Sequence, residues 1–221
     1  MSDIFREVDE EVRRDEALKI WEKYQNWVII LAIAIVAATA GYKFWQGNKI
    51  KAEQQAGAQY QAALTLAQQG KAEEAQKAFA ALTSSPQPGY QLLSRLQVAI
   101  ETGQQDAGAG VKAFDTIAAD TSVGPVIQEA AKLRAAMLLV DTASMDEIKT
   151  RLQPLTGDRQ PFRNTAREVY GYAALKANDF DLAAKQFDAV AQDPEATAAQ
   201  RQRMDAMLSY IKANQPQTKA P

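Results

Sequence analysis

The chain has 221 residues, with 25 Lys and Arg against 27 Asp and Glu, and it contains neither His nor Cys. A formal net charge of -2 argues against nucleic-acid binding, which depends on a strongly basic surface. The missing residue types remove the usual zinc ligands, the thiol nucleophile and the commonest general base near neutral pH. We therefore expect no catalytic residues, no metal and no cofactor. The lack of Cys also suits an oxidising compartment.

Residues 1–23 form an acidic segment, with five Arg or Lys against eight Asp or Glu. Apolar residues between Ile4 and Trp21 recur at helical spacing, with charges between them. Two interpretations stay open. The segment is either a short helix continuous with the residues that follow or a docking segment for a cytoplasmic partner.

An uncharged run of 19 residues extends from Tyr24 to Tyr42, between Lys23 and Lys43. A helix rises about 1.5 Å per residue, so the run reaches roughly 28 Å, close to the thickness of the hydrocarbon core of a bilayer. Aromatic residues flank it where such rings anchor at lipid headgroups: Trp21, Tyr24, Trp27, Tyr42, Phe44 and Trp45. The run predicts a single transmembrane signal anchor over residues 24–45.

Two alternatives to an anchor are a buried helix of a soluble protein and a cleaved signal peptide, because Ala38-Thr39-Ala40 has the form of a cleavage site. A secretory n-region is short and positive, whereas this one is long and acidic. Five Arg or Lys precede the run, and only Lys43, Lys49 and Lys51 follow it closely. This bias favours a cytoplasmic N-terminus and, in a bacterium, an inner-membrane protein with a periplasmic domain.

The rest of the chain contains an internal repeat of helical segments. Each repeat contains three apolar or small residues at helical spacing, and the second of the three is bulky. This bulky residue recurs at intervals of 35, 38 and 35 residues, which is typical of stacked helical hairpins. The four segments are Ala75/Phe79/Leu82, Gly110/Phe114/Ile117, Ile148/Leu152/Leu155 and Ala183/Phe187/Val190.

Each of these segments follows another segment of helical periodicity, so each repeat is predicted to be a hairpin of two helices. The first helices are expected at residues 60–68, 92–101, 127–140 and 166–176. Polar breaks within hairpins are expected at residues 69–71, 103–105 and 177–179. A last amphipathic stretch, residues 197–212, is predicted to cap the final hairpin.

These segments resemble the tetratricopeptide repeat (TPR), in which small residues lie where two antiparallel helices cross. The fourth repeat carries the resemblance best, with Gly171 at the close-packed position, Ala183 at the crossing and Pro194 after the second helix. In the middle repeats Gly110 replaces a helical Ala, and Ile148 is too large for a tight crossing, so we expect the third repeat to be splayed.

The resemblance implies an all-α fold, in which a transmembrane helix precedes a TPR-like α-solenoid of about four hairpins and a C-terminal capping helix. The alternative is a generic helical bundle of similar composition. The expected organisation is a cytoplasmic acidic tail at residues 1–23, the anchor at 24–45, a TPR-like periplasmic domain at 46–213 and a disordered tail at 214–221.

This order of segments is similar to that of the YfgM-type inner-membrane proteins, which are ancillary partners of the SecYEG translocon. The resemblance implies a membrane-anchored scaffold whose protein partners are translocon subunits, periplasmic chaperones or secreted chains. A scaffold for another envelope or respiratory complex is the alternative. An enzyme is disfavoured because the chain has no Gly-rich phosphate loop, and no small-molecule substrate is expected.

The candidate partner-binding residues are those that would line the inner surface of the solenoid. At the fifth and ninth positions of the four units they are Tyr60 and Leu64, Arg95 and Ala99, Leu133 and Met137, and Glu168 and Tyr172. Because this surface is largely apolar, we expect it to hold hydrophobic segments or a partner helix. The alternative is that these residues form hairpin core.

One basic cluster is present, and it consists of Arg151, Arg159, Arg163 and Arg167. It is either an exposed, partly compensated connection or a site for an anionic partner.

Overall fold

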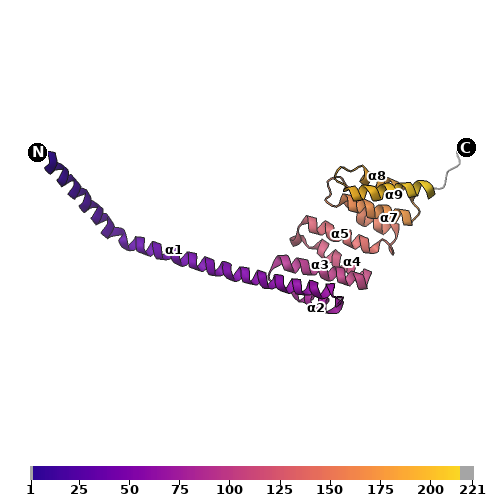
Figure 1. Cartoon of the computed structure of the whole chain (residues 1–221), viewed down its shortest axis with the longest axis horizontal. Coiled ribbons are helices and arrows are strands. Elements are labelled where there is room, and N and C mark those ends of the chain that lie inside the picture. Colours follow the sequence, from indigo (N-terminus) through magenta and orange to yellow (C-terminus); the bar gives the residue numbers. More distant parts are fainter. Residues whose placement is uncertain (1, 215–221) are drawn as a thin grey trace. The chain divides into compact units, whose positions relative to one another are not determined.

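The computed structural model describes the backbone of residues 2–214, and the side chains of Arg14, Leu18 and residues 21–214 (Figure 1). This part of the chain is all-α and contains no strand. Its elements are α1 (Ser2–Gln68), α2 (Ala72–Leu82), α3 (Pro88–Gln105), α4 (Ala107–Ala119), η1 (Thr121–Val123), α5 (Pro125–Leu139), α6 (Met145–Leu152), η2 (Gln153–Leu155), α7 (Arg163–Lys176), α8 (Phe180–Ala191) and α9 (Ala198–Asn214). The predicted tail at 214–221 lies, apart from Asn214, outside the described residues.

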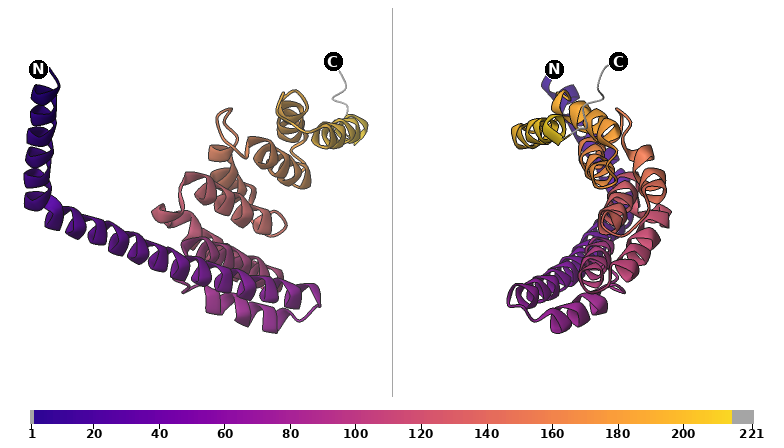
Figure 2. Two further views of the ribbon diagram at one scale, coloured as in Figure 1. Left: turned by 60° about the vertical axis from the view of Figure 1, so that its left-hand side comes forward. Right: turned by 90° about the vertical axis from the view of Figure 1, so that its right-hand side faces the viewer.

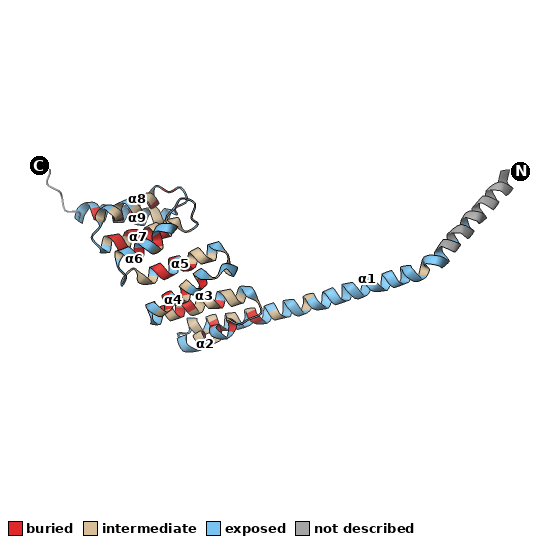
Figure 3. Cartoon of the chain, turned by 180° about the vertical axis from the view of Figure 1, so that it is seen from behind, coloured by how far each residue is buried: buried red, intermediate tan, exposed pale blue. Residues whose placement is uncertain are grey.

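The chain divides into two compact units, residues 1–55 and residues 56–221. The first consists of the greater part of α1, which is helical without interruption from Ser2, as one of the two interpretations of the acidic segment predicts. It contains the one described helix that is long and apolar enough to cross a membrane. Large apolar side chains along it are exposed, among them Trp27 at 70% and Val36 at 68% (Figure 3).

The second unit is a series of helices that follow one another in chain order (Figure 2). The end of α1 pairs with α2, and the pairs α3 and α4, α5 and α6, and α7 and α8 follow. α9 packs on α8 and buries Met204 and Ile211 there, together with Phe187. A capping helix at this end of the repeats is therefore confirmed.

The core of the second unit lies between these helices. All twelve residues of the repeated pattern are buried, from Ala75, Phe79 and Leu82 in α2 to Ala183, Phe187 and Val190 in α8. Their helical spacing places them on one face of each second helix, where they cover the first helices. The internal repeat therefore corresponds to the repeated core.

Glycine allows two pairs of helices to approach closely. A Cβ atom on Gly171 of α7 would lie under 3.0 Å from three atoms of the Phe187 ring in α8. A Cβ atom on Gly110 of α4 would overlap the backbone of Gly103 in α3. A Gly within a helix costs about 1 kcal/mol in helix propensity relative to Ala. At Gly110 the missing side chain allows α3 and α4 to lie close together, which offsets this cost.

The predicted break at residues 103–105 is wrong. α3 continues through Gln105, and the turn into α4 consists of Asp106 alone. The Asp106 carboxylate accepts a hydrogen bond from the Ala109 backbone N–H at 3.1 Å, which caps α4 without a longer loop. Gly103 lies inside α3, where its lack of a side chain makes room for α4. It does not end the helix.

The other two breaks are confirmed. Gly70 has a φ of 76° between α1 and α2, and Asn178 has a φ of 60° between α7 and α8. Both residue types tolerate this left-handed conformation. The Asp179 side chain then caps α8 by accepting from the Leu182 backbone N–H at 3.0 Å.

Candidate partner-binding surfaces

The predicted inner-surface residues lie on four different first helices, and most of them are packed. Tyr60 of α1 is half-buried, with its ring centroid 5.4 Å from that of Phe79 and 6.1 Å from that of Tyr90. Burial raises the pKa of the Tyr60 hydroxyl. Leu64 is half-buried in the same cluster.

The middle repeats contribute one exposed apolar side chain to this set. Met137 of α5 is 40% exposed, whereas Ala99 and Leu133 are buried. Arg95 of α3 forms an ion pair with Asp120, with 2.6 Å between Nη1 and Oδ2. Met137 is therefore the clearest apolar contact point among the predicted residues.

Glu168 and Tyr172 of α7 both lie beside Arg203 of α9. Arg203 of α9 donates two hydrogen bonds to the Glu168 carboxylate, at 2.9 and 3.0 Å. The Tyr172 ring packs on Phe187 at a centroid distance of 5.3 Å. The pKa of the Tyr172 hydroxyl is raised, first by burial and then by the charge of Glu168. The negative charge of the Glu168 carboxylate is paired with Arg203 within the chain.

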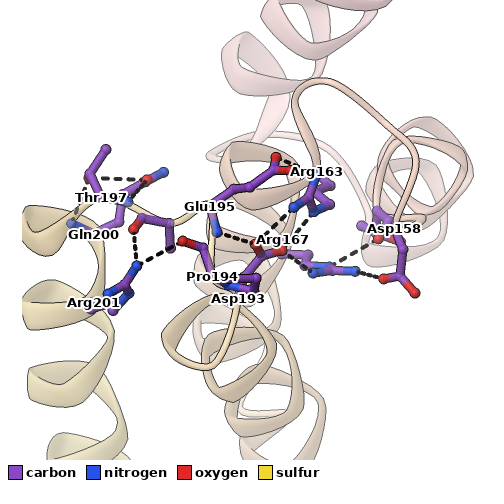
Figure 4. Close-up of polar contacts among 11 residues, drawn as sticks. Asp158, Arg163, Arg167, Asp193, Pro194, Glu195, Thr197, Gln200 and Arg201 are labelled. Atoms are coloured by element: carbon purple, nitrogen blue, oxygen red, sulfur yellow. Dashed lines mark hydrogen bonds and ion pairs between the residues drawn. The ribbon is translucent and has the colours of Figure 1, made fainter.

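Two arginines of the cluster, Arg163 and Arg167, bind Asp193, and we refer to these three residues as the Asp193 clasp (Figure 4). Arg163 binds both Asp193 oxygens, at 2.6 and 2.8 Å, and Arg167 lies 3.3 Å from Oδ2. Arg167 also binds Asp158 at 2.7 Å. The Asp193 clasp ties the segment after α8 to the beginning of α7.

All three side chains of the Asp193 clasp are nearly buried. The hydrogen bond from Arg163 is the main reason that the pKa of Asp193 lies well below its usual range. Asp193 also accepts from the Glu195 backbone N–H at 2.9 Å, so the carboxylate orders the turn that leads to α9.

The remaining arginines of the cluster differ from each other. Arg151 binds Asp115 of α4 through two hydrogen bonds, at 2.9 and 3.2 Å, and lies 3.4 Å from Glu147. Arg159 is exposed and makes no ion pair within residues 21–214. Three of the four arginines are therefore compensated by carboxylates, which favours the interpretation of a compensated connection.

Three ion pairs join positions 35 or 36 residues apart, which is one repeat. They are Asp115 with Arg151, Asp141 with Lys176, and Glu168 with Arg203. Each connects one repeat to the next or, for Arg203, to α9. The sequence carries this signal as opposite charges one period apart, and a search for that spacing would have found all three pairs.

A groove of about 580 Å³ lies beside α6 and α8 and is floored by α7, and we refer to it as the α6–α8 groove. Its lining includes Met145, Lys149, Tyr170, Leu182, Lys185 and Ala189. A smaller cavity of about 160 Å³ adjoins Ile148 on α6. α6 has 8 residues and is followed directly by η2, whereas α8 has 12 residues. Both cavities border α6 of the third repeat, although Ile148 itself is buried.

Within the part of the chain that the structure describes, no group of three or more Asp or Glu residues could hold a metal ion.

Comparison with known proteins gives one match. The family described as the tetratricopeptide repeat-like domain matches residues 19–213. No curated protein and no solved structure matches the chain. The matched range includes every hairpin of the second unit and most of α9. The chain therefore belongs to the tetratricopeptide repeat-like domain family.

Proposed function

We propose that this protein is a membrane-tethered scaffold that binds other proteins through a TPR-like solenoid. TPR-like domains generally mediate protein–protein interactions, which supports the scaffold role. The tether rests on one observation, the exposed apolar surface of α1 between Tyr24 and Tyr42. Soluble proteins rarely leave so large an apolar surface uncovered.

The ends of the apolar run support a position across a bilayer. The Lys23 ammonium group lies 5.5 Å from the Tyr24 ring centroid, and the Lys49 group lies 5.8 Å from that of Trp45. Aromatic rings and lysines are both favoured at the boundary between lipid and water. In our proposal the N-terminus is cytoplasmic and the repeats are periplasmic, following the distribution of Arg and Lys.

The partners in this proposal are translocon subunits, periplasmic chaperones or secreted chains. Support comes from the similarity of layout to the YfgM-type proteins, with an acidic segment, one apolar helix and TPR-like repeats in that order. The predicted inner surface remains our proposed contact region. Within it Met137 is the residue best placed to touch a partner, because its side chain is exposed.

Flotation with phospholipid vesicles tests the tether. The full chain, reconstituted from detergent, is expected to float with the vesicles and to resist extraction at alkaline pH. An Ile33→Asp/Val36→Asp variant should stay in the dense fraction, because a charged residue at the centre of a span costs about 2.5 to 3.5 kcal/mol. Gln61→Asp, on an exposed part of α1 in the second unit, is the matched control and should float. Equal flotation of both variants would refute the tether.

Photocrosslinking tests the partners. A photoreactive residue in place of Met137, in cells that express the full chain, is expected to link to translocon subunits or periplasmic chaperones. The same group at the exposed Lys212 is the control. Products dominated by components of another envelope or respiratory complex would replace the translocon assignment while leaving the scaffold in place.

A further inference from the structure

We propose that the second unit opens first between its first hairpin and α3, and that α3 to α9 stay together as one block when it does. The first hairpin consists of α2 and the part of α1 that packs on it. We refer to the contact of this hairpin with α3 as the first junction. Its opening is a conformational step built into the repeats, separate from partner binding at the inner surface.

Buried apolar clusters cross every later junction but not the first. One cluster joins α3 and α4 to α5, the next joins α5 and α6 to α7, and the last joins α7 and α8 to α9. The buried residues of the first cluster, Ala63, Ala75 and Phe79, all belong to the first hairpin, and α3 adds to it only the half-buried Val98. Since burial of apolar surface holds neighbouring repeats together, the first junction is the least firmly closed.

The face that α3 turns towards the first hairpin is polar at its centre. The Tyr90 ring lies 6.1 Å from that of Tyr60, and Val98 packs in the cluster of the hairpin. Ser94 lies between Tyr90 and Val98 at four-residue spacing, so it faces the same hairpin. Its side chain is fully buried, and its hydroxyl has no hydrogen-bond partner in the described part of the chain.

A buried carboxylate lies on the same face of α3. Glu101 follows Ser94 by seven residues, which is two helical turns, and it is 8% exposed. Gln97 donates a hydrogen bond to this carboxylate at 3.0 Å, but no cation pairs with it within residues 21–214. Buried polar groups without a full set of partners lose hydration when helices dock. Separation of α3 from the first hairpin would therefore restore water to Ser94 and Glu101.

The first junction also lacks the ion pair that each later junction has. The three pairs that span 35 or 36 residues join the second hairpin to the third, the third to the fourth, and the fourth to α9. Between the first hairpin and α3, the described residues form one side-chain hydrogen bond, from Gln76 Nε2 to Thr102 Oγ1 at 3.4 Å. This bond joins two neutral groups at a length beyond the usual range.

The position of the first junction gives its opening a consequence for the tether. α1 is helical from Ser2 to Gln68, so the first hairpin is continuous with the apolar run. In the proposed tethered scaffold, on which this consequence rests, the first hairpin would stay with the membrane helix while α3 to α9 move away from it. The opening itself depends only on contacts within the second unit.

Thiol protection on the full chain in detergent micelles tests the opening, because the chain has no Cys. Ser94→Cys places a single thiol in the first junction, and Ala131→Cys and Ala166→Cys place one in each of the next two. All three positions are fully buried. Each reaction rate with a maleimide, in urea too dilute to unfold the domain, is divided by the rate of the same variant when unfolded.

Ser94→Cys is expected to react about tenfold faster or more than either Ala variant, because a junction with fewer buried apolar contacts opens more often. Equal protection of the three thiols, or faster reaction of Ala131→Cys or Ala166→Cys, would overturn the proposal. Hydrogen exchange gives a second measurement without any substitution. Backbone amides of α2 are expected to exchange faster than those of α4, and equal exchange would contradict an early opening of the first hairpin.

Glu101→Met tests whether the polar face of α3 favours the opening. Met removes the buried charge at similar side-chain length, so the thiol of Ser94→Cys should react more slowly in the double variant. Asp205→Asn, on the exposed side of α9, is the control and should leave the rate unchanged. An unchanged or faster rate in a Glu101→Met variant of native helix content would refute this cause. None of these measurements needs a bilayer, so a failed junction and a failed tether give different results.

Discussion

At the scale of single residues, the absence of a side chain at Gly171 decides how α7 and α8 pack. The Phe187 ring occupies the space that a Cβ atom on residue 171 would need, and the ring itself is fully buried. The Asp193 clasp is a second local determinant, since two nearly buried arginines share the Asp193 carboxylate, although Arg163 also pairs with Glu195 and Arg167 with Asp158.

Gly171→Ala should therefore destabilise the second unit by about 1 to 3 kcal/mol, because the Phe187 ring would have to move within a packed core. Gly89→Ala, in the first turn of α3, is the control, since a Cβ atom there meets nothing within 4 Å. The control should be neutral or stabilising by up to about 1 kcal/mol. Urea unfolding followed by circular dichroism measures both. A Gly171→Ala variant as stable as the parent would show that α7 and α8 are further apart than described here.

Asp193→Asn should cost about 3 kcal/mol in the free energy of unfolding, because it leaves two nearly buried arginines without their shared charge partner. Asp205→Asn, on the exposed side of α9, should stay close to the parent. The same unfolding measurement compares the two. Equal stability of the two variants would mean that the clasp contributes nothing measurable.

The stability that Asp120 contributes should depend on pH. Hydrogen bonds from the Ser122 hydroxyl, from Arg95 and from the Ser122 backbone lower the pKa of Asp120 to about 2. A lowered pKa stabilises the folded state above the pKa of the unfolded chain, near 3.9, and this contribution is lost as pH falls through about 2. The difference in Tm between the parent and Asp120→Asn should be constant above about pH 5 and shrink towards pH 2. A difference that grows on acidification would contradict this assignment.

At the scale of elements, the third hairpin differs from the others. α6 is short and borders two cavities, although Ile148 and Leu152 on it are buried. Segments with fewer packed contacts open more readily. α6 therefore combines a buried anchoring face with an uncovered edge, where the α6–α8 groove lies.

Hydrogen exchange should resolve this difference. Backbone amides of α6 are expected to exchange faster than those of α8, and both should be slower than residues 157–161 between η2 and α7. Mass spectrometry of peptides from the full chain in detergent measures the exchange. Equal protection of α6 and α8 would mean that the third hairpin is as tightly packed as the fourth.

Much of the repeated core could be predicted because it depends on local periodicity. The spacing from Ala183 through Phe187 to Val190 places these residues on one face of a helix, and all three are buried. Gly171 was identified as the close-packed position from its place in the repeat. The break at residues 103–105 was wrong because Gly103 serves a contact with Gly110, which only the assembled helices reveal.

The candidate sites were harder to predict because they depend on which residues pair across repeats. Glu168 was predicted to line an accessible inner surface. Its carboxylate instead forms an ion pair with Arg203 of α9, which lies 35 residues later in the chain. The α6–α8 groove borders the short α6, and it does not stand out until the helices are placed side by side. Among the predicted inner-surface residues, Met137 has an exposed side chain.

At the scale of the whole molecule, a tether and a set of TPR-like repeats would restrict partner binding to a zone beside the membrane. Such a tether raises the effective concentration of the repeats for partners in the same membrane. In our proposal, α1 crosses the bilayer once and separates the acidic segment from the repeats.

Thiol accessibility tests this topology, because the chain has no Cys and each variant therefore carries a single thiol. Ser2→Cys and Lys212→Cys variants of the full chain would be treated with a membrane-impermeant maleimide in bacterial spheroplasts, before and after the membrane is disrupted. We expect labelling of Lys212→Cys in intact spheroplasts and of Ser2→Cys only after disruption, both on the full-length chain. Labelling of both thiols before disruption, of Ser2→Cys alone, or loss of the Ser2→Cys thiol from a shortened chain would contradict the account.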